Sequence, residues 1–360
     1  NFFFNRKNIN FINDLLKTSF SKKKIIIKKS KLFFNDKNDT IMFIYSISHF
    51  DYFKNEKKNK KQIKTSGKLF KLPIQFNWEK DLNTLNTTSN FKASKVDIDF
   101  LNKGFFSKGK YNYENTLNIM TNIFKTNYEK SNNEINLNSK KSLIKNTPIT
   151  YFGNIELSPF SFKIFIDAKE IDIDYFFKNT TLINEIISSN ILINDNINGI
   201  VNIKSQNLHK IKVFDNADIN FNFEEGAVNL NDSFLINDKF GKLTIRNTIF
   251  ENNNTISLLR GELSLKIFDI NYFYKFFPVV KKKRLKRKFN KINFNFTLNL
   301  INSKFSIDRI NFLDNKDKIL HSKDVDDFVE ENYETRFNFS NSVLFKNFMK
   351  KVIIAYLDEG

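Results

Sequence analysis

The chain contains 360 residues, of which 41% are hydrophobic and 15% aromatic, and 43 of them are Phe. This apolar content excludes an intrinsically disordered chain, and the absence of Cys excludes disulfides, thiolate metal sites and Cys nucleophiles. The formal net charge is +19, but Lys and Arg are spread over the whole length, so charge alone does not identify a partner.

The first residues are expected to precede the main fold. The chain begins at Asn1 rather than Met, so we expect it to be the later part of a longer protein. Residues 1–21 are predicted to be an N-terminal helix or a segment of the truncated chain, with a short helix over Asn10–Phe20. No stretch reaches the roughly 18 uninterrupted apolar residues of a membrane span, so any membrane anchor is expected upstream.

Residues 22–310 are predicted to be a repetitive β region. From Ile292 to Leu300 every second residue is apolar, and the residues between them are Asn or Thr. A strand with one buried face has this period of two, whereas a helix would spread the same residues around its circumference. Many such segments are separated by short polar breaks rich in Asn and Asp, which are favourable turn residues.

The alternation predicts an elongated, curled antiparallel sheet that forms a one-sided apolar groove, with a few short helices. Antiparallel sheets commonly bury one face and leave the other in water. A closed sandwich or barrel would bury the apolar face without a ligand, whereas a trough would leave it for acyl chains to cover. The residues expected to line the groove are Ile74, Phe76, Trp78, Val96, Ile98, Phe100, Phe162, Ile164, Ile219, Phe221, Phe223, Leu263, Leu265, Ile267, Ile292, Phe294, Phe296 and Leu298.

Helical patterns are few. Asp174–Ser189 has apolar residues close to a period of 3.6, which predicts an amphipathic helix. Residues 311–341 are mostly charged or polar and are predicted to be a charged loop or linker. Residues 342–360 are predicted to be a C-terminal helix, because apolar residues recur at helical spacing over Ser342–Tyr356.

An internal repeat relates two segments, Gly67–Phe76 and Gly153–Phe162. Gly, the apolar residue two positions later, Pro and the following apolar pair fall in register. The pattern predicts a strand that begins at a Gly bend and is interrupted at Pro, which cannot donate a ladder hydrogen bond. Gly199 and Gly261 are expected to begin strands in the same way, and chance similarity in a biased composition is the alternative.

The sequence offers no catalytic or metal-binding motif. His49, His209 and His321 have neither a second His nor a paired carboxylate at metal-ligand spacing. A phosphate-binding Gly loop and a G-x-S-x-G motif are also lacking. We therefore expect a non-enzymatic protein without a cofactor.

Residues 281–288 form a run with seven basic side chains, for which two interpretations are considered. Contact with lipid headgroups or nucleic acid is one interpretation, and a solvated loop between two strands is the favoured alternative. Nucleic-acid surfaces interleave aromatic and basic residues, whereas the alternation in this chain predicts aromatic residues on the opposite strand face from the charges. Nucleic acid is therefore not expected as a partner. The candidate headgroup contacts are Lys281, Lys282, Lys283, Arg284, Lys286, Arg287 and Lys288.

Residues 191–310 resemble the C-terminal region of AsmA-like proteins. The resemblance is carried by a recurring strand, glycine, apolar-x-apolar and polar-turn pattern, and it extends as a pattern over most of Lys22–Ile310. It is seen in Asn198–Ile203, Asp218–Leu230, Phe240–Ile245 and Arg260–Leu265.

The resemblance implies a cell-envelope protein of a Gram-negative-type bacterium, anchored in the inner membrane by an N-terminal helix with a β-rich periplasmic body. It also implies a curled sheet similar to that of bridge-like lipid-transfer proteins. The implied function is to bind phospholipid and conduct it between the inner and outer membranes, or to maintain outer-membrane assembly. The given sequence does not include such an anchor, which we expect upstream of Asn1. A structural or adhesive β-repeat envelope protein that binds no lipid is the alternative.

Overall fold

The structure is a computed structural model in which the described strands belong to one sheet of 22 strands. The prediction of a mainly β chain is therefore confirmed. The chain divides into two compact units, which are described separately. Unit 1 comprises residues 1–166, 185–201 and 223–226, and unit 2 comprises residues 167–184, 202–222 and 227–360. The described residues are 2–4, 24–35, 41–131, 133–172, 194–209, 212–252, 257–284, 288–301, 304–331 and 342–358.

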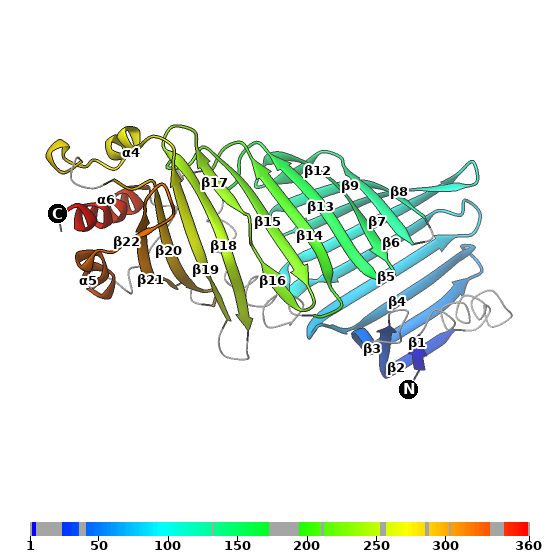
Figure 1. The fold of residues 1–360 in the computed structure, drawn as a ribbon. Helices are drawn as coiled ribbons and strands as arrows, with labels where there is room; N and C mark the ends of the chain where they lie inside the picture. The colour runs from blue at the N-terminus through cyan, green and yellow to red at the C-terminus, as the bar shows by residue number, and fades with distance from the viewer. Residues whose placement is uncertain are drawn as a thin grey trace. The chain divides into compact units, whose positions relative to one another are not determined.

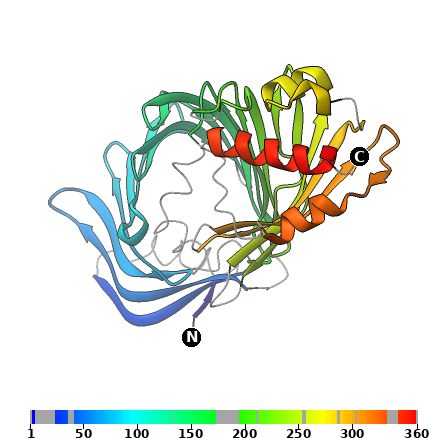
Figure 2. The ribbon, with the colours of Figure 1, turned by 90° about the vertical axis from the view of Figure 1, so that its left-hand side faces the viewer.

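Unit 1 is built from strands that mostly pair with their neighbours in chain order (Figure 1). Strands β2 to β9 form an uninterrupted antiparallel series, β10 and β11 both pair with β9 and β12, and β1 is parallel to β2. In Figure 2 this series, from blue to green, follows a curved path. The strands are β1 (Phe2–Phe4), β2 (Ile25–Asn35), β3 (Ile41–Asn55), β4 (Lys60–Leu69), β5 (Leu72–Asp81), β6 (Thr87–Ala93), β7 (Ile98–Ser107), β8 (Lys110–Ile119), β9 (Asn122–Lys130), β10 (Glu134–Ser139), β11 (Ser142–Ile144), β12 (Thr147–Leu157) and β13 (Phe160–Ala168), with the first residues of β14 (Asn198–Ser205).

Unit 2 combines an antiparallel sheet with helices. Its strands pair in the order β15, β17, β18, β19, β20, β21 and β22. The elements are β15 (Asn216–Glu224), β16 (Ala227–Asn229), β17 (Phe234–Asn237), β18 (Gly241–Asn252), β19 (Ser257–Ile267), α4 (Ile270–Phe276), β20 (Lys291–Asn299), β21 (Lys304–Leu313), β22 (Ile319–Leu320), α5 (Lys323–Glu331) and α6 (Ser342–Asp358).

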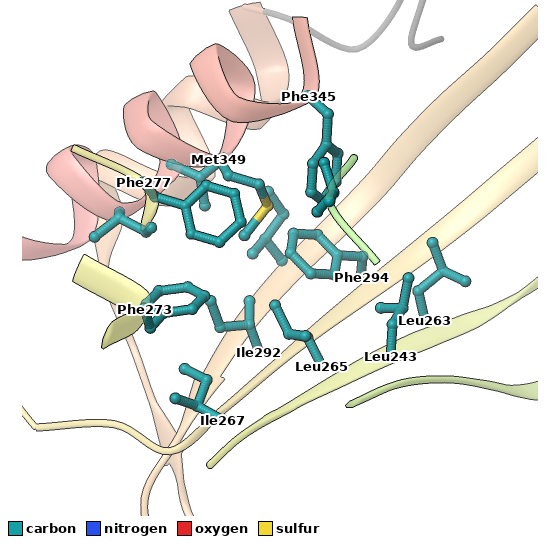
Figure 3. Close-up of a cluster of buried hydrophobic side chains, with 14 of the residues drawn as sticks. Leu243, Leu263, Leu265, Ile267, Phe273, Phe277, Ile292, Phe294, Phe345 and Met349 are labelled. Atoms are coloured by element: carbon teal, nitrogen blue, oxygen red, sulfur yellow. The ribbon is translucent and has the colours of Figure 1, made fainter. Parts of the chain in front are cut away.

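The hydrophobic core of unit 2 lies between its sheet and its helices. Figure 3 shows Phe345 and Met349 of α6 and Phe273 near them, over Ile292 and Phe294 of β20. Met349, Phe273 and Ile292 have no exposed surface, and all five side chains belong to one continuous cluster. Helices α4 and α6 therefore close the apolar face of this sheet.

Two helices of unit 2 were not predicted. Helix α4 is a short aromatic-rich segment that begins at an Asp269 cap, whose carboxylate accepts hydrogen bonds from the backbone N–H groups of Asn271 (2.8 Å) and Tyr272 (3.0 Å). Such capping satisfies N–H groups that have no partner within the helix. The segment is shorter than two helical periods, so its pattern did not distinguish it from a strand.

The second correction concerns residues 311–341, which were expected to be a charged loop. They contain the end of β21, all of β22 and helix α5. In α5, Val325 is 2% exposed, and Phe328 and Val329 pack against the core. One narrow apolar stripe is sufficient to pack a helix against a core. Because charged residues surround this stripe, the segment was predicted to be a loop.

The remaining helix predictions have different outcomes. The C-terminal helix expected at 342–360 is α6. The helices predicted at Asn10–Phe20 and Asp174–Ser189 lie outside the described residues, as does most of the segment 1–21, of which β1 is described.

Several hairpin turns use left-handed residues other than Gly. Between β4 and β5, Phe70 and Lys71 have φ of 48° and 64°, and between β7 and β8 Lys108 (49°) precedes Gly109 (76°). Two consecutive positive φ angles are required by the type I′ turn, whose twist matches that of paired strands. The expectation that Asn and Asp make the turns is met at Asn146 (70°), whereas Phe70, Lys71 and Lys108 bear the steric cost of their Cβ atoms.

The two copies of the Gly…Pro repeat both form hairpins, but Gly does not begin their strands. Gly67 lies inside β4 and Gly153 inside β12, and Gly261 likewise lies inside β19. A Cβ atom at Gly67 or Gly153 would collide with a backbone carbonyl of the neighbouring strand, at Ser46 or Lys163 respectively. The turn begins three residues after Gly67 but five after Gly153, so the copies differ in turn position. These glycines permit close strand approach.

Candidate functional site

The sheet of unit 1 has one polar and one apolar face. On the polar face, oppositely charged side chains form ion pairs: Lys92 of β6 lies 3.1 Å from Asp99 of the neighbouring β7, and Lys140, which follows β10, lies 3.0 Å from Glu114 of β8. Residues on one face of a strand are separated by two positions. The strand register therefore identifies which side chains share the other face, and three rows of them carry the functional argument below.

The first row, called the Phe row, crosses strands β3 to β9. Each member is the cross-strand partner of the next, and all are half-buried. Such directly opposed aromatic and aliphatic side chains stabilise a sheet. The row forms a continuous apolar band except at one Thr. Its members are Phe50, Thr65, Phe76, Phe91, Phe100, Leu117 and Phe124.

The second row, called the middle row, lies two residues along each strand from the Phe row. Its part on β3 to β5 is apolar and consists of Tyr52, Ile63 and Trp78. From β6 onward it becomes polar, with Asn102 as one member. The complete row is Tyr52, Ile63, Trp78, Ser89, Asn102, Asn115 and Thr126.

The third row begins with three cations on adjacent strands. Lys54 of β3 is directly opposite Lys61 of β4, which is directly opposite Lys80 of β5. We call these three residues the Lys row. Because Lys54 lies four residues from Phe50, the face changes from apolar to basic over roughly 13 Å of strand.

Beyond the lysines the third row passes through Thr87 and Gly104 and reaches Tyr113 and Tyr128. The rings of Tyr111 and Tyr113 are 5.7 Å apart, and those of Tyr113 and Tyr128 are 4.7 Å apart with an interplanar angle of 7°. The Tyr128 hydroxyl donates to Asn102 Oδ1 at 2.9 Å. Burial raises the pKa of Tyr128 to about 12, so this hydroxyl stays protonated and remains a donor at neutral pH.

A bulge in β3 brings two further residues onto the apolar face. The register shifts between Ile47 and His49, so Tyr45 and Ile47 share a face with Phe50 despite the odd spacing. The Tyr45 hydroxyl lies 2.9 Å from Thr65 Oγ1, and Thr65 Oγ1 in turn donates to the His49 carbonyl at 3.0 Å. The one polar member of the Phe row therefore has hydrogen-bond partners within the sheet.

Many of the residues predicted to line a groove do lie on this face. Ile74, Phe76, Trp78, Ile98 and Phe100 belong to it, with Ile74 the most buried of them at 9% exposure. Strand alternation alone did not identify Phe50, Phe91, Leu117 and Phe124, because the cross-strand register was needed to show that they continue one row.

Two predicted lining residues of β13 and three of β15 are half-buried. Phe162 of β13 packs against Phe223 with ring centroids 5.5 Å apart, and a Cβ atom at Gly199 would collide with the Phe162 ring. Ile164 is also half-buried, as are Ile219 and Phe221 of unit 2.

The remaining predicted lining residues require correction. Val96 is in a short 3₁₀ helix, Ser94–Val96, and is 3% exposed, because the chain leaves the strand before the left-handed Asp97. Six residues of unit 2 lie in its closed core rather than on an open face, since α4 and α6 cover them, and Leu298 packs at the edge of that core. The six are Leu263, Leu265, Ile267, Ile292, Phe294 and Phe296.

The basic run at 281–288 is partly engaged within unit 2. Lys283 Nζ lies 2.6 Å from an Asp358 carboxylate oxygen at the end of α6. Arg284 donates to the Val279 carbonyl at 2.8 Å and lies over the Tyr274 ring at 6.0 Å. These contacts favour a structural role for both residues. Lys281, Lys282 and Lys288 are exposed, and Lys286 and Arg287 lie outside the described residues.

The histidines form no cluster of ligands. His49 Nε2 lies 3.1 Å from Asp51, and His209 Nδ1 lies 3.0 Å from Glu170. Within the described part of the chain, no three His, Cys, Asp or Glu side chains are grouped so that they could hold a metal ion. In that same part, no helix has the length and apolar character needed to cross a membrane.

Comparison of the chain with protein-family models, with curated proteins and with solved structures found no match. The features that point to a function are therefore the apolar face of unit 1 and the sequence resemblance to AsmA-like proteins.

Proposed function

We propose that this chain binds phospholipid on the apolar face of unit 1 and conducts it between the inner and outer membranes. The observation that carries the proposal is the Phe row, a band of half-buried apolar side chains across seven neighbouring strands, β3 to β9. Contact of such a band with water is unfavourable. Covering it with acyl chains would stabilise the complex by roughly 0.8 kcal/mol per buried methylene.

The contrast between the two units supports this proposal. In unit 2, helices of the chain itself cover the apolar face, and Ile292 and Met349 have no exposed surface. In unit 1, the Phe row stays half-buried, with Phe76 and Phe100 as examples. The resemblance to AsmA-like proteins supports a periplasmic location and attachment to the inner membrane.

The single Trp of the chain allows a direct test. Trp78 lies in the middle row, beside the Phe row and the Lys row. Phosphatidylcholine with brominated acyl chains quenches Trp fluorescence only when the chains contact the indole. We expect titration with vesicles of this lipid to quench Trp78. No quenching, together with no phospholipid found by native mass spectrometry of protein extracted from membranes, would favour the structural or adhesive alternative.

A matched pair of substitutions on β7 provides the control. Phe100→Asp places a charge in the Phe row, whereas Phe105→Asp places it on the opposite face, where Phe105 is 41% exposed. We expect Phe100→Asp to fold and to abolish quenching, and Phe105→Asp to be quenched like the original protein. Equal quenching in both variants would contradict the proposed binding face.

A further inference from the structure

We propose that the Lys row is a headgroup site, and that the apolar face selects anionic phospholipids over zwitterionic ones. The inference rests on the proposed function, because it assigns a lipid class to the same face. Lys54, Lys61 and Lys80 are directly opposed on three adjacent strands. Strand spacing of roughly 4.8 Å brings their ammonium groups within reach of one phosphate.

The two outer lysines of the Lys row differ from lysines on the polar face in their surroundings. Lys60 on the polar face has its Nζ 2.5 Å from Glu79. In the described part of the chain, no carboxylate lies within 4.0 Å of the Nζ atom of Lys54 or Lys80. Lys80 instead lies over the Tyr111 ring, 5.8 Å from its centroid. The cationic charge of Lys54 and Lys80 is therefore available to a ligand.

The three ammonium groups of the Lys row also influence one another. Like charges directly opposed across strands destabilise a sheet. Burial lowers the pKa of Lys61, and the charges of Lys80 and Lys54 lower it further. An anion bound among the three ammonium groups would remove the repulsion.

The order of the rows matches the order of groups in a phospholipid. Along β5, Lys80 is followed on the same face by Trp78 and then Phe76, so the face passes from cationic to amphipathic aromatic to fully apolar. Trp is well suited to the junction between polar headgroups and acyl chains. An anionic headgroup at the Lys row would place its acyl chains along the Phe row.

The test compares two brominated lipids by quenching of Trp78 at fixed ionic strength. We expect vesicles of brominated phosphatidylglycerol to bind at least about tenfold more tightly than vesicles of brominated phosphatidylcholine, since each Lys adds attraction to an anionic headgroup. In the triple variant Lys54→Gln, Lys61→Gln and Lys80→Gln, the preference should fall to near unity with phosphatidylcholine binding unchanged.

General attraction of a basic protein to an anionic surface is the main alternative source of a preference. The control is a triple variant with the same charge change on the polar face, Lys64→Gln, Lys103→Gln and Lys125→Gln, all exposed. It should keep the full preference. Loss of preference in both triple variants, or its persistence in the Lys-row variant, would overturn the headgroup site.

The outcomes separate this inference from the proposed function. Equal quenching by both lipids in the original protein would overturn the headgroup site and leave lipid binding intact, whereas no quenching by either lipid would overturn both. Inorganic phosphate should compete only weakly, because the site is assigned to a lipid headgroup; full displacement by phosphate alone would overturn that assignment. If the triple variant does not fold, Lys80→Gln alone should lower the preference severalfold.

Discussion

The rings of Phe312 and Tyr356 stack with centroids 3.9 Å apart and an interplanar angle of 10°, and this contact joins β21 to the last turns of α6. Both residues are 1% exposed. Phe289 packs edge-on against both rings, at 4.7 Å from Phe312 and 5.4 Å from Tyr356. Helix α6 is thus an integral part of the core of unit 2.

Tyr356→Ala is expected to destabilise unit 2 by about 3–5 kcal/mol, the usual cost of removing a large aromatic side chain from a core. Chemical denaturation followed by near-ultraviolet circular dichroism would measure the loss. Lys351→Ala, at an exposed position of the same helix, should change stability by less than about 0.5 kcal/mol. Similar losses in the two variants would contradict the docking of α6.

The closed core of unit 2 makes a separate prediction for β20. Phe294→Asp places a carboxylate at a position that is 4% exposed and surrounded by apolar side chains. Burying an unpaired charge costs several kcal/mol, so unit 2 should not fold. Hydrogen exchange measured by mass spectrometry over β19 to β21 should then be unprotected. Asn295→Asp, at the exposed neighbouring position, should leave protection unchanged.

The hairpin between β4 and β5 can be stabilised at one residue. Lys71 is exposed and has φ of 64°, a conformation that costs a non-Gly residue roughly 1–2 kcal/mol. Lys71→Gly removes this cost but adds freedom to the unfolded chain, so we expect a net gain of about 0.5–1 kcal/mol in denaturation experiments. Lys68→Gly, in the strand itself, should have the opposite sign. A loss of stability in Lys71→Gly would contradict the left-handed turn.

Stability of unit 2 should depend on alkaline pH through Tyr274. Burial raises the pKa of Tyr274 to about 12, with Tyr356 adding to the rise and the Arg284 guanidinium opposing it. The unfolded chain loses this proton near the ordinary pKa of 10.0. The stability that the raised pKa of Tyr274 gives to unit 2 is therefore complete below about pH 10. This stability is lost as pH rises toward 12, by at most about 2.7 kcal/mol.

The substitution Tyr274→Phe isolates this effect, because a phenyl ring carries no proton that titrates. The Tyr274 hydroxyl is buried and has no hydrogen-bond partner among the described residues, so the substitution should cost little at neutral pH. Between pH 10 and 12 the variant should lose less stability than the original protein. Parallel pH profiles for the two proteins would contradict the raised pKa.

The sequence alone predicted the local structure of this protein well where the signal was strong. Alternation over Ile292–Leu300 indicated a strand, and β20 occupies most of that segment. The C-terminal helix was predicted from its spacing and is α6. Such patterns are local, because the spacing of apolar residues within one strand or amphipathic helix shows which of its faces is buried.

The tertiary structure decided what covers each apolar face. Phe294 and Phe100 each follow an alternation of apolar and polar residues in the sequence, but Phe294 lies in the closed core of unit 2, whereas Phe100 is half-buried in the Phe row. Helix α4, which contributes Phe273 and Tyr274 to the same core as Phe294, was too short to predict.

The Lys row, too, was decided by the tertiary structure. Lys54, Lys61 and Lys80 are scattered in a chain rich in Lys, and only the strand register places them directly opposite one another. The alternation of a strand determines which of its residues share a face. Pairing between strands depends on contacts distant in the sequence, so only the folded structure shows which faces are closed and where charges gather.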